Sequence, residues 1–404
     1  MNIVLIADSY PPEIRSVSLM MQELAEDLVL RGHSVTVVTY WPRYNLSADT
    51  KKIKFKELST ENNVMVIRVK TPPHHNVNFM IRGISELISP FLFWMKIKKL
   101  IKQRIDAIVV YISPLPLALV GSKVKRKYGS RFLLNIQDIF PQNAIDLGIL
   151  KNDFLIKFFE YIEKKTYRRA DKITTHTENS KNFLIEKKQI PPDKISIVHN
   201  WIDTKPYTNA QKTDLFRRKH GLEGKFIFLF AGIIGPAQGL DLIVKVANEL
   251  REMSEICFLF VGNGSEKETL SRMVDLHGLK NVIFKDFVSI EEYPYLVKSA
   301  DVGLVCLSKK NRTPVVPGKI LGYMAASIPV AAFLNKESDG HVLIKEAECG
   351  YSIISDSSVN EVKNLIVKIY YERDTLNRYG ENGRRYVLKH FTKSSCINDL
   401  IKLI

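Results

Sequence analysis

The sequence lacks several patterns that would assign it to a common kind of chemistry at once. Its four cysteines, Cys257, Cys306, Cys349 and Cys396, lie far apart and form no Cys-x-x-Cys pair. It contains no Asp-x-Asp pair, no Walker phosphate loop, no His-x-x-x-His pair and no Gly-x-Ser-x-Gly turn. These absences argue against a disulfide framework, a zinc site and a serine-hydrolase elbow, and we expect no metal cofactor. Cysteines placed inside apolar stretches are typical of a reducing compartment.

Long hydrophobic runs are also missing. No stretch of about 18 consecutive apolar residues occurs, so the sequence predicts no membrane-spanning helix. The first residues form an apolar, strand-like stretch with no basic region before it, which argues against a signal peptide. The chain has 404 residues, 45% of them hydrophobic and 25% charged, which suits two or three globular domains.

Negative charge is scarce in the first half. Residues 1–205 carry 32 Lys and Arg against 20 Asp and Glu, whereas the remainder carries 27 against 23. The first half is therefore expected to face an anionic partner: a phosphate-rich ligand, an acidic membrane leaflet or a nucleic acid. Because nothing resembles a base-reading helix or a stacking platform, we expect no nucleic-acid partner.

One pattern occurs twice: a strand, a tight loop and a helix, first over residues 3–30 and again over residues 226–250. Each copy begins a series of alternating strands and helices, which predicts an α/β protein of two Rossmann-like, doubly wound domains. We expect a first domain of residues 1–205 with the terminal helix 386–404, and a second domain of residues 206–385. Such sheets bind ligands beyond the carboxyl ends of their strands, so a large ligand would lie in a cleft between the two domains.

The expected elements follow from apolar periodicity. Helices are expected at 16–30 and 154–169, and the tail from 374 to 404 is expected to be helical with a break near Gly380–Gly383. Ser16 or Ser18 is expected to cap the first helix. Strands are expected at 3–7, 35–40, 64–69, 108–112, 132–136, 172–175, 195–198, 226–231, 257–261, 282–284, 302–306, 329–333 and 351–354.

Glycine-rich turns after two strands of the second half are candidates for a phosphate site. Glycine lets backbone N–H groups approach a phosphate, although a plain tight turn has the same composition. These turns are Gly232-Ile-Ile-Gly235 and Gly262-Asn263-Gly264. Pro317-Gly318-Lys319 then opens a helix, where a lysine opposes the helix dipole unless an anion is bound or the side chain is simply solvated.

Candidates in the first half follow its first and fifth strands. Asp138 comes where a strand gives way to a loop, so it either faces a ligand or caps a turn. Arg15 stands where the first loop enters a helix and could meet a phosphate there, beside Ser16. His74 and His75 follow two prolines and are expected to contact a ligand or solvent rather than a metal.

The stretch 79–104 is apolar and strongly basic, which is typical of a segment that lies in a lipid headgroup layer. A domain helix with lysines on its outer face has the same pattern. The residues expected at the membrane are Phe91, Trp94, Lys96, Lys98, Lys99 and Lys102.

Taken together, these motifs resemble family 4 glycosyltransferases of the two-domain GT-B type, over nearly the whole chain. The matching segments are Tyr10-Pro11-Pro12, Leu24-Ala25, Gly32-His33, Val35–Thr39, His199–Asp203, Ser299–Val302, Pro317-Gly318-Lys319 and Tyr323–Val330. Two further segments, 137–148 and 237–241, resemble a narrower branch, the WbuB-type N-acetyl-L-fucosaminyltransferases of O-antigen and capsule assembly. That branch uses a UDP sugar and a polyprenyl-diphosphate-linked N-acetylglucosamine acceptor.

The resemblance implies a donor site in the second half and an acceptor site in the first. The uracil base is expected near the backbone of Val288, and the diphosphate at Gly232, Gly235 and Gly318-Lys319. Asp138 could take the proton from the acceptor hydroxyl. The enzyme would work at the inner face of the cytoplasmic membrane, against anionic lipid, with Ser16, His74 and His75 on the acceptor side.

The chain departs from the family pattern at charged positions. A pair of glutamates common in the family corresponds here to Pro314 and Gly322, and its phosphate-binding Arg and Lys correspond to Ile233 and Gln238. Positive charge on the diphosphate would then come from Lys319, Arg15 and, third, Arg312.

Two alternatives stay open. One is a UDP-sugar 2-epimerase of the same fold, which needs no lipid acceptor. The other is a basic membrane-binding or nucleic-acid-binding module without activity.

Overall fold

The computed structural model describes residues 1–404 except 47–49, 75–76, 113 and 211–214. The chain forms two compact units, Met1–Asn200 with Lys393–Ile404, and Trp201–Thr392. The borders expected from sequence, at 205 and 386, both fall inside the second unit. The reason at the second border is that α15, Leu376–His390, is one continuous helix that packs against α12, Lys319–Ala325.

The first unit contains one sheet with the strand order β3-β4-β2-β1-β5-β6-β7-β8. All neighbouring strands are parallel except the antiparallel edge pair β3–β4. Its strands are β1 Asn2–Ile6, β2 Ser34–Tyr40, β3 Leu58–Glu61, β4 Val64–Val69, β5 Ala107–Ile112, β6 Arg131–Ile136, β7 Lys172–Thr175 and β8 Ile195–Ile197. Central strands such as β5 are buried along their whole length, as near-continuous apolar runs require.

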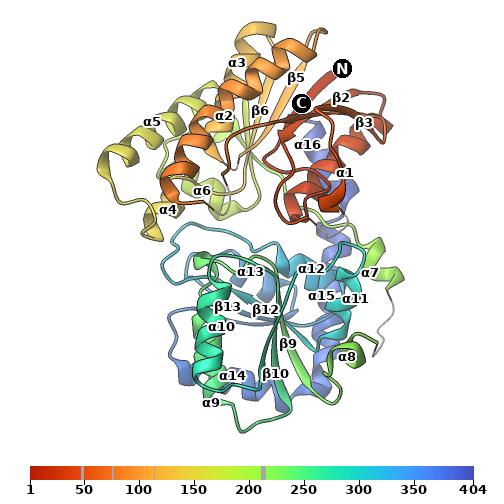
Figure 1. Cartoon of the computed structure of the whole chain (residues 1–404), viewed down its shortest axis with the longest axis vertical. Coiled ribbons are helices and arrows are strands. Elements are labelled where there is room, and N and C mark those ends of the chain that lie inside the picture. Colours follow the sequence, from red (N-terminus) through yellow and green to blue (C-terminus); the bar gives the residue numbers. More distant parts are fainter. Residues whose placement is uncertain (47–49, 75–76, 113, 211–214) are drawn as a thin grey trace. The chain divides into compact units, whose positions relative to one another are not determined.

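Helices cover both faces of this sheet (Figure 1). On one side α2 packs against α3 and α3 against α5; on the other α1 packs against β2 and the returning helix α16. Arg31, the C-cap residue of α1, donates a hydrogen bond to Asn398 of α16 over 2.7 Å. The helices are α1 Ser16–Leu30, α2 Phe79–Leu100, α3 Ala118–Tyr128, α4 Gln142–Asp146, α5 Asp153–Arg169, α6 Glu178–Glu186 and α16 Lys393–Ile401, with 3₁₀ turns at Thr50–Lys52, Leu115–Leu117 and Pro192–Lys194.

The second unit contains a fully parallel sheet with the order β11-β10-β9-β12-β13-β14. Its strands are β9 Phe226–Ala231, β10 Ile256–Val261, β11 Val282–Lys285, β12 Val302–Cys306, β13 Val330–Leu334 and β14 Gly350–Ile354. Two apolar cores, one on each face, bury the central strands β9, β10, β12 and β13 almost completely, whereas the edge strands β11 and β14 are partly buried. Only the strand ends therefore remain available for polar groups.

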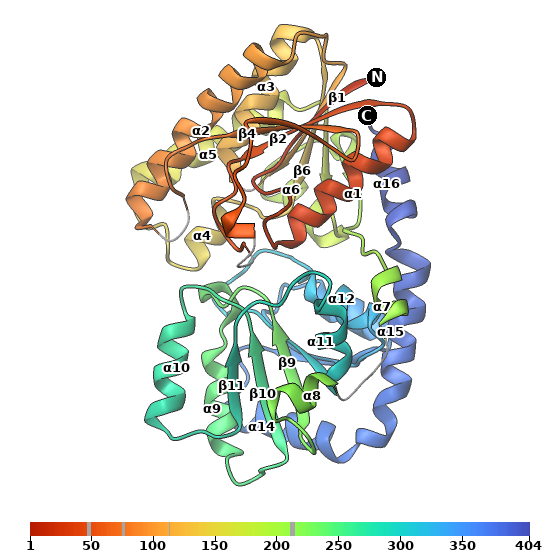
Figure 2. The same cartoon turned by 45° about the vertical axis from the view of Figure 1, so that its right-hand side comes forward.

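Helices again lie on both faces of the second sheet (Figure 2). One group, α9, α10 and α14, packs together, and α12 packs against α15 on the opposite core. The helices are α7 Lys205–Asn209, α8 Leu215–His220, α9 Asp241–Glu249, α10 Lys267–Leu276, α11 Tyr293–Ser299, α12 Lys319–Ala325, α13 Gly340–Glu346, α14 Val359–Tyr371 and α15 Leu376–His390, with 3₁₀ turns at Pro236–Gln238 and Arg373–Thr375.

Two expectations about helices were wrong. The first helix is capped by Arg15, without a side-chain hydrogen bond, while Ser16 is its first helical residue and Ser18 is buried inside it. The expected break at Gly380–Gly383 does not occur, because α15 continues to His390. A Cβ at Gly380 would lie 2.1 Å from the carbonyl oxygen of Ser327, so this glycine serves close packing rather than a turn.

Candidate functional site

Three polar side chains meet at the carboxyl edge of the first sheet. Asp8 follows β1, Tyr111 lies at the end of β5, and Asp138 follows β6, and these three strands are neighbours in the order β1-β5-β6. The charges of Asp8 and Asp138 both act to raise the pKa of Tyr111. Adjacent strand ends therefore bring together two carboxylates that are 130 positions apart in the sequence.

Asp8 is the buried carboxylate of this group. It is only 4% exposed, and its Oδ2 accepts a hydrogen bond from Nη1 of Arg15 at 2.6 Å. Its other oxygen, Oδ1, is buried and has no hydrogen-bond partner among the described residues. The carboxylate offsets the charge of the guanidinium, so Arg15 is not an uncommitted cation at this edge.

Asp138 is the solvent-accessible member. Burial among the surrounding groups, together with the nearby charge of Asp8, raises its pKa, and Arg15 opposes the change. The side chain itself keeps exposed surface, so solvent screens part of this shift. A carboxylate that is accessible and has a raised pKa is suited to receive a proton.

The loop that carries Asp8 and Arg15 is held by buried hydrogen bonds. The Ser9 hydroxyl donates to Glu13 at 2.7 Å and lies 2.6 Å from the Ser18 hydroxyl. Glu13 also accepts from the backbone N–H groups of Arg43 and Tyr44, and burial raises its pKa. These contacts fix the position from which Arg15 reaches Asp8.

A polar cluster beside Asp138 did not stand out from the sequence. Gln137 and Asn200 exchange side-chain hydrogen bonds of 2.7 and 3.1 Å, and Gln137 also donates to Asn135 at 2.6 Å. His199 Nδ1 lies 2.9 Å from the carbonyl oxygen of His176, whose ring is buried. Burial, aided by His199, lowers the pKa of His176 to about 4 and keeps it neutral. Gln137, His199 and Asn200 lie in segments that resemble the family pattern, but no role in the site was expected from the sequence for any of them.

The other candidates of the first unit are placed less favourably. His74 is buried, its ring centroid lies 4.1 Å from that of Tyr40, and burial lowers its pKa to about 4. It is therefore part of the core rather than a surface contact. Ser16 is exposed at the start of α1. His75 lies outside the described residues.

The main candidate at the carboxyl edge of the second sheet is Lys319. From the first turn of α12 its ammonium reaches Oε1 of Gln238 at 3.2 Å and lies 4.7 Å from the ring centroid of Phe230. A Cβ at Gly232 would lie 2.6 Å from Cε of Lys319, so glycine at this position makes room for the lysine. In the parts of the chain that the structure describes, no carboxylate pairs with this ammonium. Burial lowers the pKa of Lys319 to about 8.

The second glycine turn has a structural explanation. A Cβ at Gly262 would lie 1.8 Å from the Gly232 carbonyl oxygen, and one at Gly264 would lie 2.1 Å from that of Ile234. The two loops are joined by backbone hydrogen bonds, among them Ile234 N–H to Asn263 at 2.9 Å. These glycines are therefore needed for loop-on-loop packing, whereas a Cβ at Gly235 would meet only the Ile233 side chain, at 3.9 Å.

Three donor-side candidates remain. Gly318 is exposed and caps α12, and a Cβ at this position would meet no atom within 4 Å. Arg312 is exposed in the segment between β12 and α12. Val288 follows β11 and packs, partly buried, on the core of the second unit. The position of Gly322 faces the hydroxyls of two tyrosines, each 3.5 Å from where its Cβ would be.

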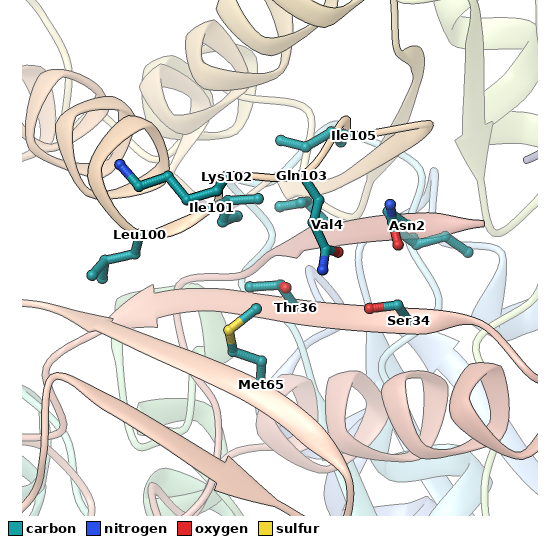
Figure 3. Close-up of a pocket in the computed structure, with 11 residues that line it drawn as sticks. Asn2, Val4, Ser34, Thr36, Met65, Leu100, Ile101, Lys102, Gln103 and Ile105 are labelled. Atoms are coloured by element: carbon teal, nitrogen blue, oxygen red, sulfur yellow. The ribbon is translucent and has the colours of Figure 1, made fainter.

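Two cavities lie away from the strand ends that carry these polar groups. One of about 150 Å³ sits where β1 and β2 begin, at the opposite edge of the first sheet from Asp8 (Figure 3). A groove of about 500 Å³ runs between α9, α10 and α14. Neither reaches the strand ends that carry the polar groups. The described residues contain no group of three or more His, Cys, Asp or Glu arranged to hold a metal ion.

The residues expected at a membrane differ in their exposure to solvent. Phe91, Lys98, Lys99 and Lys102 are exposed, whereas Trp94 is partly buried against the core. Lys96 forms an ion pair with Glu57. None of the helices in the described part of the chain is long and apolar enough to cross a bilayer.

Comparison with protein families matches both halves of the chain. Residues 17–206 match the model described as Glycosyltransferase Family 4, and residues 212–386 match the model described as Glycosyl transferases group 1. Together the two matches extend over most of the sequence: the first covers most of the first unit and ends at residue 206, just inside the second, and the other lies within the second unit.

Individual proteins agree with these matches. The chain is 24% identical over 335 residues to WcaI, a glycosyl transferase assigned to colanic acid biosynthesis in Escherichia coli (strain K12), covering 80% of this chain and 81% of WcaI. Its fold is that of sucrose-phosphate synthase from Thermosynechococcus elongatus, with a TM-score of 0.78, 14% identity and coverage of 100% and 98%. Anabaena HepE, solved with UDP-glucose, has a TM-score of 0.74 at 14% identity and covers 100% of both chains.

The Asp8–Arg15 ion pair is expected to contribute to the free energy of unfolding. Asp8→Ala leaves the guanidinium of Arg15, 19% exposed, without its partner, and should lower the free energy of unfolding by about 2–3 kcal/mol. Asp27→Ala on α1 removes the more exposed partner of Arg31 and should cost less than about 0.5 kcal/mol. Urea unfolding of both variants measures the difference, and equal small losses would show that the Asp8 pair is not structural.

Proposed function

Because the chain belongs to the group 1 and family 4 glycosyltransferases of GT-B fold, we propose that it transfers N-acetyl-L-fucosamine from a UDP sugar to undecaprenyl-diphosphate-linked N-acetylglucosamine. The reaction would serve bacterial O-antigen or capsule assembly. The observation that carries the donor half is the partly buried ammonium of Lys319, which lacks a carboxylate partner at a carboxyl strand edge in the described part of the chain. The sugar and the acceptor are supported by the resemblance of segments 137–148 and 237–241 to one branch of the family.

The diphosphate of the donor is the group that best fits the surroundings of Lys319. A cation that is withdrawn from water without a counter-ion is costly, and a bound phosphate would supply the missing charge. Gln238, at the position of the family's phosphate-binding lysine, is hydrogen-bonded to the Lys319 ammonium. In the family, the phosphate-binding positive charge lies in the loop after β9. In this chain Lys319 supplies it from α12, next to that loop.

The leaving group in this reaction is UDP, on whose β-phosphate negative charge grows as the bond to the sugar breaks. A fixed ammonium stabilises that charge without reorganisation, which is an effective use of electrostatics in a site. Gly235 leaves space for the phosphate oxygens beside the loop, and Arg312 is a second cation on the segment leading to α12.

On the acceptor side we assign the base to Asp138. Its carboxylate is accessible, and burial with the Asp8 charge raises its pKa, both of which favour uptake of a proton from a sugar hydroxyl. Asp8 is buried, so it acts on this step through its charge, which adds to the raised pKa of Asp138. Arg15, already paired with Asp8, would orient this carboxylate rather than meet the donor diphosphate directly.

The acceptor of this reaction is anchored in a membrane by its polyprenyl chain. The proposed enzyme therefore works as a peripheral protein at the inner face of the cytoplasmic membrane. The positive charge of residues 1–205 supports contact with anionic lipid.

The direct test is turnover of a panel of UDP sugars with a short-chain lipid-diphosphate N-acetylglucosamine, in the presence of EDTA. Product with UDP-N-acetyl-L-fucosamine is expected, and its anomeric configuration distinguishes retention from inversion. Conversion of a UDP sugar without any acceptor would favour the epimerase instead. No product with any sugar, while UDP still raises the melting temperature, would reject the proposed donor or acceptor.

Lys319→Ala should reduce kcat/KM by about 30- to 150-fold, the loss of about 2–3 kcal/mol of transition-state stabilisation. UDP favours the charged lysine, so binding raises its pKa above the value of about 8 in the free protein. Affinity for UDP should be flat below pH 8 and weaken as the pH rises above it. Calorimetric titration should show no such weakening in Lys319→Ala, whereas exposed Lys310→Ala should behave as the wild type. Wild-type turnover in Lys319→Ala would remove this lysine from the site.

Asp138→Asn should lower kcat by about 10²-fold or more and change the Kd for UDP by less than about twofold. In the wild type, kcat should fall as the pH drops through the raised pKa of Asp138, because the base must be ionised; the variant should lack this dependence. Exposed Asp153→Asn is the matched control. Weaker UDP binding with normal acceptor kinetics would move Asp138 to the donor side.

A further inference from the structure

The outer face of α2 carries an apolar stripe that no part of the described chain covers. Its five members are between 41% and 56% exposed and follow one another at spacings of three and four residues, so they form one line along the helix. They are Ile81, Ile84, Ile88, Phe91 and Met95.

The opposite face of α2 is apolar as well. Phe93 and Ile97 are fully buried and join the core under the first sheet. A helix on the surface of a globular unit normally turns polar side chains outward, so an apolar outer face points to a partner.

The neighbouring helix α5 repeats the feature. Phe154, Phe158 and Tyr161 are 78%, 36% and 61% exposed, and their spacing also places them on one face. Both helices contact the 3₁₀ turn Leu115–Leu117, and both pack partly buried side chains on the same core. In Figures 1 and 2, α2 and α5 cover the same side of the sheet. The two stripes therefore belong to one side of the unit.

Charge around the stripes is mostly positive. The one acidic residue of α2, Glu86, is buried and accepts a hydrogen bond from Arg82 at 2.7 Å, so the exposed face of this helix presents no carboxylate. The end of α2 and the segment after it add exposed Lys98, Lys99, Lys102 and Arg104. On α5, exposed Lys157, Lys164, Arg168 and Arg169 outnumber the exposed Asp153 and Glu160.

We propose that this surface, the exposed apolar stripes of α2 and α5 with their flanking cations, docks on an anionic phospholipid bilayer. Aliphatic and aromatic side chains would enter the boundary between headgroups and acyl chains, and the lysines would meet the headgroup charges. The combination of an exposed apolar line with adjacent cations fits lipid better than a second copy of this basic chain, whose like charges would repel. The inference deepens the proposed function and rests on it, because it names the surface that brings the enzyme to a lipid-held acceptor.

The surface differs from the one that the sequence suggested. Trp94 is partly buried, with Lys98 and Lys127 within 6.0 and 5.7 Å of its ring centroid, and Lys96 is engaged with Glu57. Insertion is therefore assigned to the isoleucines, Phe91 and Met95. Of the residues expected at the membrane, Phe91 and the lysines at and after the end of α2 keep that role.

The test is co-sedimentation with vesicles of phosphatidylglycerol and phosphatidylcholine. Ile84→Gln/Ile88→Gln/Phe91→Gln should lower the partition coefficient at least tenfold with little change in melting temperature, since all three side chains are exposed. The control Leu276→Gln/Val342→Gln/Tyr371→Gln removes three large side chains that together are more exposed than those of the stripe variant but lie on the second unit, and should bind like the wild type. Lys98→Gln/Lys99→Gln/Lys102→Gln should weaken binding and reduce its dependence on salt.

Unchanged partition of the stripe variant would overturn the proposal. So would a dimer of the wild type that the stripe variant loses, without vesicle binding by either, because the surface would then join two copies of the chain. Turnover of a soluble short-chain acceptor by the stripe variant should equal that of the wild type. Vesicle binding can thus succeed where the glycosyl-transfer assay fails, and the two proposals fail separately.

Discussion

Burial of both faces of two parallel sheets is the constraint on which the rest of this structure depends. Strands such as β5 and β10 are buried at every residue, so all but the last of their side chains serve mainly packing. Polar groups are confined to the places where strands end, and parallel strands end together at one edge. Asp8, Tyr111 and Asp138 in the first unit, and the loop after β9 with Lys319 in the second, are consequences of that geometry.

The carboxyl edges of the two sheets differ in how their charged side chains are paired. In the first unit, Asp8 and Arg15 neutralise each other over 2.6 Å, which leaves Asp138 as the accessible carboxylate. In the second, Lys319 has an amide and an aromatic ring as neighbours but no carboxylate among the described ion pairs. The first edge, where Arg15 is paired with Asp8, suits a neutral sugar hydroxyl. The second edge, where the Lys319 ammonium has no paired carboxylate among the described residues, suits a diphosphate. The proposed assignment of acceptor and donor follows from this contrast.

Glycine has several different uses in this chain, and they explain why motif reading was only partly informative. Gly232 accommodates the lysine, Gly262 accommodates another loop, and Gly380 accommodates a carbonyl oxygen of the neighbouring segment. A glycine-rich turn in the sequence is equally consistent with a bound phosphate and with such contacts. Only the atoms that a Cβ would meet distinguish these cases.

Local sequence patterns predicted the α/β class, nearly all strands to within one or two residues, the position of Asp138 after a strand and that of Lys319 at the start of a helix, because apolar periodicity and turn chemistry are local. Tertiary structure decided what is not local. It paired Arg15 with Asp8 and buried His74. It also packed Gly380 against the backbone of Ser327 and left the outer face of α2 uncovered by the described chain. Each of these depends on which distant segments pack together, and the spacing of residues along one segment carries no information about that.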